Sequence, residues 1–167
     1  MSKVLPSEKL PSNTSPPSSQ IVEFWVDGVP RPQGSKRHVG GGRMVEASPH
    51  VKGWRDLVSA VAFQSMPGDP ISTPVGVAVH FLFPRPKSHY RTGKNAHLLR
   101  AGAPDRPTTR SVGDTDKLCR AILDSLAVTS GGGVLVDDSQ VVWLYGQKDW
   151  VQGDEGPGAY VRVVNIG

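Results

Sequence analysis

Apolar and polar residues alternate in three stretches of the chain, and this period of two predicts β-strands. The run IVEFWV, from Ile21 to Val26, predicts a first strand that ends at Asp27-Gly28. From Val75 to Phe83 every second residue is valine or phenylalanine, which predicts a half-buried strand whose other face is also partly apolar. The segment AYVRVVNI, from Ala159 to Ile166, predicts the last strand.

Two other segments repeat their apolar residues at the spacing of an α-helix. The first begins at Ser48-Pro49, as N-cap and first turn, and ends at Pro67-Gly68. Its apolar face is expected to comprise Trp54, Leu57, Val58 and Val61. The second helix is expected from Asp116 to Leu126, with Leu118, Ile122 and Leu126 along one side.

The remaining segments are rich in glycine, proline and charge. Gly40-Gly41-Gly42 predicts the tip of a basic hairpin that runs from about Lys36 to Glu46. Pro84 to Arg110 has no usable periodicity and is interpreted as a long basic loop. After the second helix we expect a short strand from Val134 to Val136, a turn at Asp137-Asp138 and a strand from Gln140 to about Tyr145.

This order of elements predicts one domain of the broad α/β class, more narrowly α+β, from residue 21 to residue 167. A mixed β-sheet covered by two helices is expected. Residues 1–20 are rich in serine and proline and hold almost no large apolar residue, so this tail is expected to be disordered.

Charge is distributed unevenly along the chain, although the net charge is only +4. From residue 31 to residue 110 there are thirteen Lys and Arg against four acids, a local net of +9. Residues 111–167 hold four bases and eight acids, a local net of −4. An acidic pocket beside a basic surface is what hydrolysis of a polyanion's phosphodiesters requires, so a nuclease is the leading hypothesis.

The cellular setting is predicted from what the chain contains. A single cysteine, Cys119, fits a reducing interior. No apolar run approaches the roughly 18–20 residues of a membrane span, and no hydrophobic stretch of a signal peptide follows the N-terminus. We therefore expect a soluble protein without a membrane partner, in the cytoplasm, or in the host cytoplasm if a phage encodes it.

Four carboxylates, in two clusters embedded in apolar sequence, are the main candidates for chemistry. Asp114 and Asp116 lie where the second helix begins, and Asp137 and Asp138 form the turn before a strand. Acids are rarely buried unless they are paired or bound to a metal, and Mg²⁺ takes oxygen donors. If the strands flank the helix, the clusters can face each other, and a divalent cation would offset their repulsion and activate water.

A structural role is the alternative for each cluster taken alone. Asp114 could be an N-cap and Asp116 could complement the helix dipole. Arg120 could pair with Asp116 and Asp124 on successive turns, and Asp pairs are common in turns. The combination of both clusters is what favours a metal site.

Two stretches resemble the RusA family of Holliday junction resolvases, especially its phage-borne members. The first, DGVPRPQGSKRHVGGGRMVEASPHVKGWRDLV, is similar to the family's Gly-x-Pro start, basic hairpin and tryptophan-containing helix. The second, GDTDKLCRAILDSL followed by GVLVDDSQVVWLYGQK, is similar to its D-x-D helix, its D-D-x-x-V turn and the lysine that closes the next strand. Together they cover most of residues 22–148.

The resemblance implies a homodimeric endonuclease that nicks two strands of a four-way junction with Mg²⁺, or alternatively Mn²⁺. Such enzymes resolve branched DNA in recombination, repair and replication. The resemblance places the metal-binding catalytic acids at Asp114, Asp116 and Asp138, with Asp137 the less critical member of its pair. A two-fold dimer suits a junction with two-fold symmetry.

The catalytic cation is left open between two residues. The resemblance places the family's catalytic lysine at Arg120, while Lys117 stands where the family has asparagine. Arginine keeps the charge, but its planar head is always protonated, so the two side chains are not equivalent. Either Lys117 or Arg120 could serve.

Basic residues outside these clusters are candidates for contacts with DNA. They are Lys36, Arg37, His38 and Arg43 in the hairpin, Arg85, Lys87 and Arg91 in the long loop, and Lys148, which matches the basic residue on the last strand of the motif. Trp25, Trp143 and Trp150 could stack on unpaired bases, but Trp25 and Trp143 are expected to be buried at the sheet.

Two other classes of function compete with the nuclease. A protein that binds branched DNA without cleaving it would explain the departures at Lys117 and Arg120, although all three metal acids are present. A nucleotide-sugar enzyme can also use a D-x-D motif to bind a metal–diphosphate. The chain is short for that fold and lacks a doubly wound αβ pattern.

Overall fold

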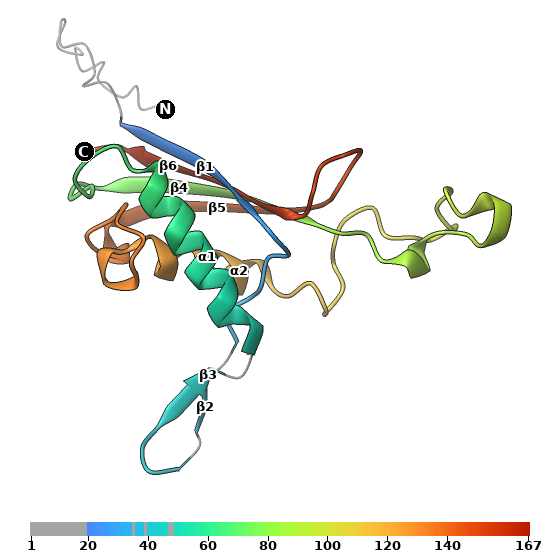
Figure 1. Cartoon of the computed structure of the whole chain (residues 1–167), viewed down its shortest axis with the longest axis horizontal. Helices are drawn as coiled ribbons and strands as arrows, with labels where there is room; N and C mark the ends of the chain where they lie inside the picture. The colour runs from blue at the N-terminus through green and yellow to red at the C-terminus, as the bar shows by residue number, and fades with distance from the viewer. Residues whose placement is uncertain (1–19, 35, 39, 47–48) are drawn as a thin grey trace, which may run out of the picture.

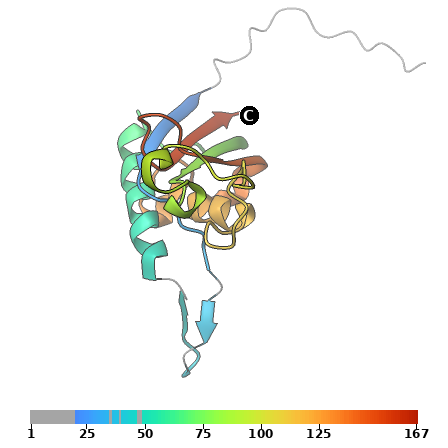
Figure 2. The same ribbon diagram turned by 90° about the vertical axis from the view of Figure 1, so that its right-hand side faces the viewer.

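The computed structural model describes residues 20–34, 36–38, 40–46 and 49–167. A four-stranded sheet carries two α-helices on one side (Figure 1 and Figure 2). In sheet order the strands are β1 (Ile21–Asp27), β6 (Gly158–Asn165), β4 (Val75–Phe83) and β5 (Val141–Trp150), and the helices are α1 (Pro49–Ser65) and α2 (Thr115–Leu126). β4 and β5 are parallel and the other neighbours antiparallel, so the predicted mixed α+β sheet is confirmed.

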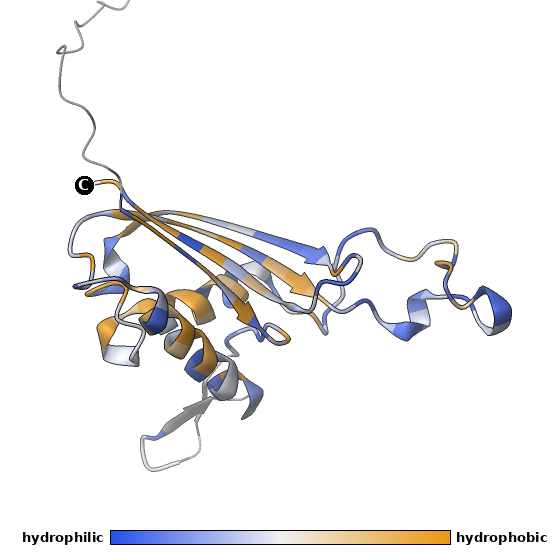
Figure 3. Ribbon diagram, turned by 45° about the horizontal axis from the view of Figure 1, so that its top comes forward, coloured by the Kyte–Doolittle hydropathy of each residue, from blue (hydrophilic) through white to orange (hydrophobic). Residues whose placement is uncertain are grey.

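The period of two decides which side of the sheet is buried. Along β1, Val22, Phe24 and Val26 are buried while the residues between them are not. The matching positions of β6 and β4 are buried as well, so the sheet and the helices enclose one core. In Figure 3 apolar colour runs along the strands and on the side of the helices that meets them.

The two helices bury the sides that their spacing indicates, with one exception. Leu118, Ile122 and Leu126 of α2 are fully buried, as predicted. The buried stripe of α1 comprises Val51, Trp54, Val58 and Ala62. The prediction that Leu57 belongs to it is wrong: Leu57 is exposed, because it lies about 100° around the helix from the centre of that stripe.

Two basic segments project from this body (Figure 1). β2 (Lys36–His38) and β3 (Met44–Glu46) pair antiparallel and form the predicted hairpin. Residues 84–104, which we call the arm, leave the end of β4. The arm has 3₁₀ turns at Lys87–His89 and Gly93–Asn95 and an antiparallel bridge between Tyr90 and Leu99, so this part of the predicted loop is ordered.

The segment before β5 differs from the prediction. Val134–Val136 is not a strand, since only Leu135 forms isolated bridges, to Ile71 and Ala127, among the described residues. The predicted turn is a 3₁₀ turn, η4 (Asp138–Gln140), and β5 extends five residues further than expected, to Trp150. Residues 1–19 of the predicted tail and the predicted N-cap Ser48 lie outside the described residues.

The environments of three tryptophans differ from the prediction. Trp25, expected to be buried, is half-buried. Trp143 is 43% exposed, with its ring against the backbone of Gly76, while Trp150 is only 3% exposed. Trp150 lies at the base of the arm and donates its indole N–H to the carbonyl of Pro104, at 3.0 Å. In the described part of the chain, no helix combines the length and apolarity needed to span a membrane.

Candidate active site at the start of α2

The first acidic cluster lies where α2 begins. Asp114 occupies the N-cap position, but its side chain accepts no hydrogen bond from the helix. Its carboxylate instead pairs with the Lys117 ammonium, with Oδ2 and Nζ 2.9 Å apart. Asp116 follows in the first turn, exposed and in no ion pair within the described residues. Both carboxylates therefore face solvent at the positive end of a helix.

Positive charge surrounds Asp114. The hydrogen bond and charge of Lys117 hold the pKa of Asp114 below its usual range, and the charges of Lys148 and Arg110 act in the same direction. The same pairing raises the pKa of Lys117. Both groups are thus ionised at neutral pH. A cation that binds Asp114 has an anionic oxygen available, but it must compete with Lys117.

The loop after β1 holds this end of α2 from one side. The backbone N–H of Gln33 donates to the carbonyl of Lys117 at 3.0 Å. Pro32 packs against Gly113, where a Cβ atom would lie 2.5 Å from the proline ring and where φ is +91°. Gln33 is 6% exposed and its side-chain oxygen has no hydrogen-bond partner within the described residues. Sequence reasoning misses both loop residues, because the prolines there argue only against a helix.

Strand β5 holds α2 from the other side. A Cβ atom on Gly146 would lie 2.5 Å from Sγ of Cys119 and 3.0 Å from Thr115, so only glycine permits this approach. Two residues further along, Lys148 donates from Nζ to the carbonyl of Gly113 at 2.9 Å. Lys148 is therefore brought next to Asp114. Burial raises the pKa of the Cys119 thiol to about 11, so it is neutral and packs as a small apolar group.

The second cluster divides into one bonded and one free carboxylate. Asp137 accepts from the N–H of Ser139 at 2.9 Å, and its own N–H donates to the side chain of Gln140 at 2.8 Å, which closes a capping box. The bonds to Ser139 lower the pKa of Asp137. Asp138 is exposed, and its carboxylate has no hydrogen bond or ion pair in the described structure. Asp137 thus shapes the turn, and Asp138 is available to a ligand.

A single chain does not bring the predicted metal acids together. Among the described residues, no three Asp, Glu, His or Cys side chains are grouped so that they could hold a metal ion. Asp114 lies beside the end of β5 that carries Lys148, whereas Asp138 precedes the first residue of that strand, Val141. The strand from Val141 to Lys148 spans about 23 Å.

The two candidate catalytic cations differ in their surroundings. Lys117 is bound to Asp114, as described above. Arg120 lies one turn after Asp116, is exposed, and forms no ion pair within the described residues. The alternative in which Arg120 pairs with Asp116 and Asp124 is therefore not observed. Of the two, Arg120 has its charge free for a bound phosphate.

The predicted DNA contacts lie in the hairpin, in the arm and, as Lys148, on β5. Lys36, Arg37 and His38 form β2, but their side chains lie outside the described structure, while Arg43 is exposed near the hairpin tip. Lys87 and Arg91 are exposed on the arm, and Nε of Arg91 donates to the carbonyl of Leu99.

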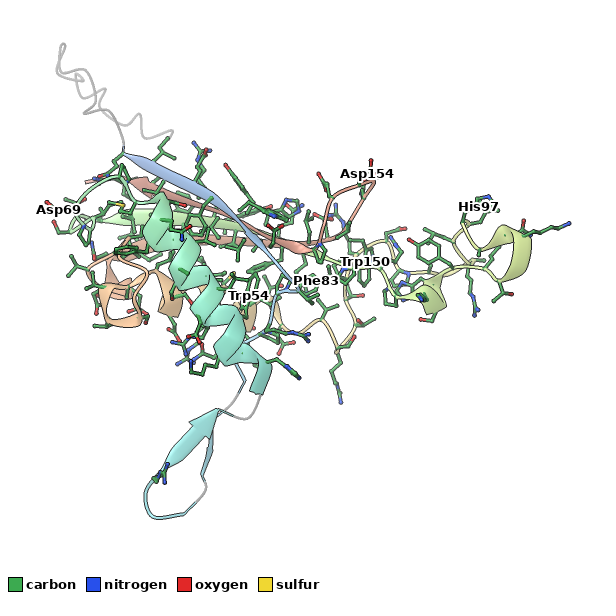
Figure 4. All side chains as sticks on the ribbon, in the orientation of Figure 1. Trp54, Asp69, Phe83, His97, Trp150 and Asp154 are labelled. Carbon is green, nitrogen blue, oxygen red and sulfur yellow. The ribbon has the colours of Figure 1, made fainter. Side chains whose placement is uncertain are left out.

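Arg85, the third predicted DNA contact of the arm, makes contacts within the protein. Its guanidinium lies 5.2 Å from the ring centre of Trp150 and donates to the carbonyl of Pro104 at 2.9 Å. Figure 4 shows Trp150 at the base of the arm and His97 at its far end. Arg85 therefore stabilises the base of the arm through these two contacts.

The fold and the site together define a class of protein. It is a small α+β protein with exposed acids, lysines beside them and two projecting basic segments, and these features are typical of an enzyme that acts on nucleic acid. Residues 27–164 match the family Endodeoxyribonuclease RusA. Because the match covers most of the chain, the protein belongs to this family of Holliday junction resolving endonucleases. Family members generally depend on a divalent metal. A comparison with curated proteins found no match.

Proposed function

We propose that this protein is a Mg²⁺-dependent Holliday junction resolvase that hydrolyses paired phosphodiesters of branched DNA in recombination, repair and replication. It would act in the cytoplasm of the cell, or of the host if a phage encodes it. The observation that carries this proposal is the pair of exposed carboxylates, Asp114 and Asp116, beside Lys148 and within the region that matches the family.

The donor set suits a hard cation. Asp114 and Asp116 offer ionised oxygens, which Mg²⁺ prefers, and Mn²⁺ accepts the same ligands. When bound, the ion would neutralise charge that develops on the phosphate oxygens and lower the pKa of a bound water. The residues of the chain do the rest. Lys148 and Arg120 add positive charge for the phosphate, and the hairpin and the arm hold the DNA backbone.

The exposed edge of the sheet supports the proposal of a homodimer. β5 is an outermost strand, and Val142, Trp143, Leu144 and Tyr145 are all exposed along it. A long apolar edge strand invites pairing with another strand, and proteins that stay monomeric usually protect such edges. We infer that a second copy of the chain pairs with this edge through its own β5, since a two-fold axis brings the same strand to both sides.

This pairing would also supply the missing carboxylate. If β5 pairs antiparallel about the centre of the exposed run, between Trp143 and Leu144, the partner's Val141 lies opposite Gly146. Gly146 is the residue that contacts the first turns of α2. The partner's Asp138, three residues before the partner's Val141, would then lie next to Lys148 and the first acidic cluster. Each metal site would take Asp114 and Asp116 from one chain and the partner's Asp138.

One observation favours a second candidate, a branched-DNA-binding protein without catalysis. In the described part of one chain, the acids do not form a three-residue metal group. A single set of reactions separates the two functions. The protein is incubated with a synthetic four-way junction, the matching duplex and the matching single strand, each with Mg²⁺, Mn²⁺ or EDTA.

A resolvase should nick the junction at two symmetric positions with Mg²⁺ or Mn²⁺, leave the duplex and the single strand intact, and lose activity in EDTA. Junction binding without nicks under every metal condition would refute catalysis and support the alternative. Cleavage that survives EDTA would refute the role of the metal.

A further inference from the structure

The side of the sheet that faces away from the helices holds a cavity of about 760 Å³, within the range of small-molecule sites. It lies near the end of β5, between the loop that follows the arm and the loop between β5 and β6, whose outer end carries Asp154 in Figure 4. Lys148 faces α2, whereas its neighbour Asp149 lines this cavity. The cavity is therefore separate from the acidic site, on the opposite face of the same strand.

Aromatic rings form one wall of the cavity. Trp25 packs on Gly158, where a Cβ atom would be only 2.2 Å from the indole ring. Its indole N–H donates to Asp27 at 2.7 Å, which fixes the orientation of the ring. Tyr160, the cross-strand neighbour of Trp25, is exposed beside it. A ring that packs on glycine and also lines a cavity gives that cavity an aromatic surface on which a planar group can stack.

The polar groups of the cavity are of two kinds. Asp149 is already satisfied, because it accepts from His80 at 2.8 Å and from Gln147 at 2.5 Å and pairs with Arg106. Asp105 and Glu155 also line the cavity, and neither side chain has a hydrogen bond or ion pair in the described structure. Two unpaired acceptors thus stand near an aromatic wall.

We propose that this cavity binds an unpaired nucleobase, with guanine preferred. Base stacking on an aromatic side chain needs only the flat face that Trp25 offers. The N1–H and N2–H groups of guanine can donate in parallel to one carboxylate, such as Glu155 or Asp105. Cytosine and adenine offer an amino group, and thymine offers only its ring N–H. The proposal rests on the proposed function, because the branch point of a junction is where bases can leave the duplex.

A cationic ligand is the competing occupant of this cavity. An ammonium or guanidinium could also bind an aromatic wall and two carboxylates. Arg106 is already paired with Asp149, so it does not neutralise Asp105 and Glu155. A base is the occupant that we infer, because the protein belongs to a family that acts on branched DNA. The phosphates of a strand whose base entered the cavity would be held outside it, by the basic arm whose base adjoins Trp150.

Tryptophan fluorescence tests the proposal without DNA cleavage. The full chain is titrated with deoxyguanosine, deoxyadenosine, deoxycytidine and thymidine. Deoxyguanosine should quench at the lowest concentration and thymidine at the highest. Trp25→Phe should remove most of the quenching and leave at most the part that comes from Trp150, which also lines the cavity. The matched variant Trp143→Phe should keep the quenching, because Trp143 packs on Gly76 outside the cavity. Asp105→Asn with Glu155→Gln should weaken deoxyguanosine binding about 10-fold or more and erase its advantage over thymidine.

Three results would overturn the proposal. They are no quenching by any nucleoside, quenching of Trp25→Phe as strong as that of the wild-type protein, and quenching by arginine methyl ester with none by nucleosides. The last would assign the cavity to a cationic partner. The outcome is independent of the proposed function. A protein that cleaves junctions but binds no nucleoside loses only the base site, and one that binds nucleosides but cuts nothing loses only the resolvase assignment.

Discussion

The two ends of β5 differ in the acids and cations that lie beside them. At the end near Lys148, two carboxylates lie at the start of α2 among positive charges, held by the loop after β1 and by Gly146. At the other end, the Asp138 carboxylate is free within the described structure and its neighbour Asp137 is engaged in a capping box. Among the described residues, neither end groups three acids that could hold a metal ion. In the proposed dimer, a second copy would cover the exposed strand between them.

The difference between the two ends explains why one chain looks incomplete. The end near Lys148 has the cations that a phosphate needs but lacks a third acid, and the end near Asp138 has an acid without a cation. An antiparallel pair of β5 strands would place the Lys148 end of each chain beside the Asp138 end of its partner, which gives two equivalent sites. Dimerisation and metal binding would then be one event, and a monomer would bind the metal weakly.

The largest effect is expected from the free carboxylates. Each of three substitutions should reduce junction cleavage by well over about 100-fold: Asp114→Asn, Asp116→Asn and Asp138→Asn. Loss of a residue that only hydrogen-bonds a metal ligand already costs up to roughly 100-fold. Junction affinity should stay the same or rise, because less negative charge repels the phosphates. Asp137→Asn is the matched control and should retain most of the activity. Cleavage assays with gel-shift binding check this, and wild-type cleavage by Asp138→Asn would refute the assignment.

Nearly as large an effect on cleavage is expected from a charge placed on the exposed edge of β5, where the second copy is proposed to pair. Leu144→Arg should place like charges at the two-fold axis, give a monomer in analytical ultracentrifugation, and abolish cleavage. Phe63→Arg is the control, since Phe63 is also exposed, at 65% against 45% for Leu144, but lies on α1. A Leu144→Arg protein that remains dimeric, or a monomer that still cleaves, would break the link between β5 and the metal site.

A moderate effect on junction affinity is expected from substitutions in the two basic segments, the hairpin and the arm. Lys36→Ala with Arg37→Ala should weaken junction binding and flatten its salt dependence by about one unit for each lost phosphate contact. Arg85→Ala should leave the slope unchanged, because Arg85 contacts Trp150 of β5 and Pro104 at the base of the arm. The measurement is junction affinity against salt concentration. An unchanged slope in the hairpin variant, with a reduced one in Arg85→Ala, would reverse these roles.

The smallest effect concerns Lys117. Lys117→Met removes the cation that competes for Asp114 and returns the pKa of Asp114 toward its usual value. Since Asp114 remains ionised at neutral pH, the Mg²⁺ concentration for half-maximal cleavage should fall by a few-fold. Arg120→Ala should instead lower the single-turnover rate. A Lys117→Met protein without cleavage would show that Lys117 is the catalytic cation.

The strands and the buried side of α2 can be predicted from the sequence, because a period of two or of 3.6 shows directly which positions share a face. Periodicity does not show what covers a face. Trp143 has the pattern of a buried strand residue, yet β5 is an edge strand and the residue is exposed. The contact of Pro32 with Gly113 joins segments about eighty positions apart, and no local pattern reveals it.

The acids can be identified from the sequence, but their arrangement cannot. Spacing along one chain leads to the expectation that Asp114, Asp116 and Asp138 converge within it. The part of β5 from Val141 to Lys148, about 23 Å long, separates the two clusters. The sequence of each cluster does not show this separation. If the third ligand is Asp138 of a second chain, neither the spacing along the sequence nor the structure of one chain shows the complete site.

Mixed dimers test this account most directly. Asp116→Asn and Asp138→Asn chains are co-expressed with two different tags and purified through both, so that each dimer holds one of each. If the sites are shared, one site of the mixed dimer combines both substitutions and the other is intact. It should then nick one strand of a four-way junction, while both parent homodimers cut neither. A mixed dimer that binds the junction but is as inactive as its parents would show that each site is built within one chain.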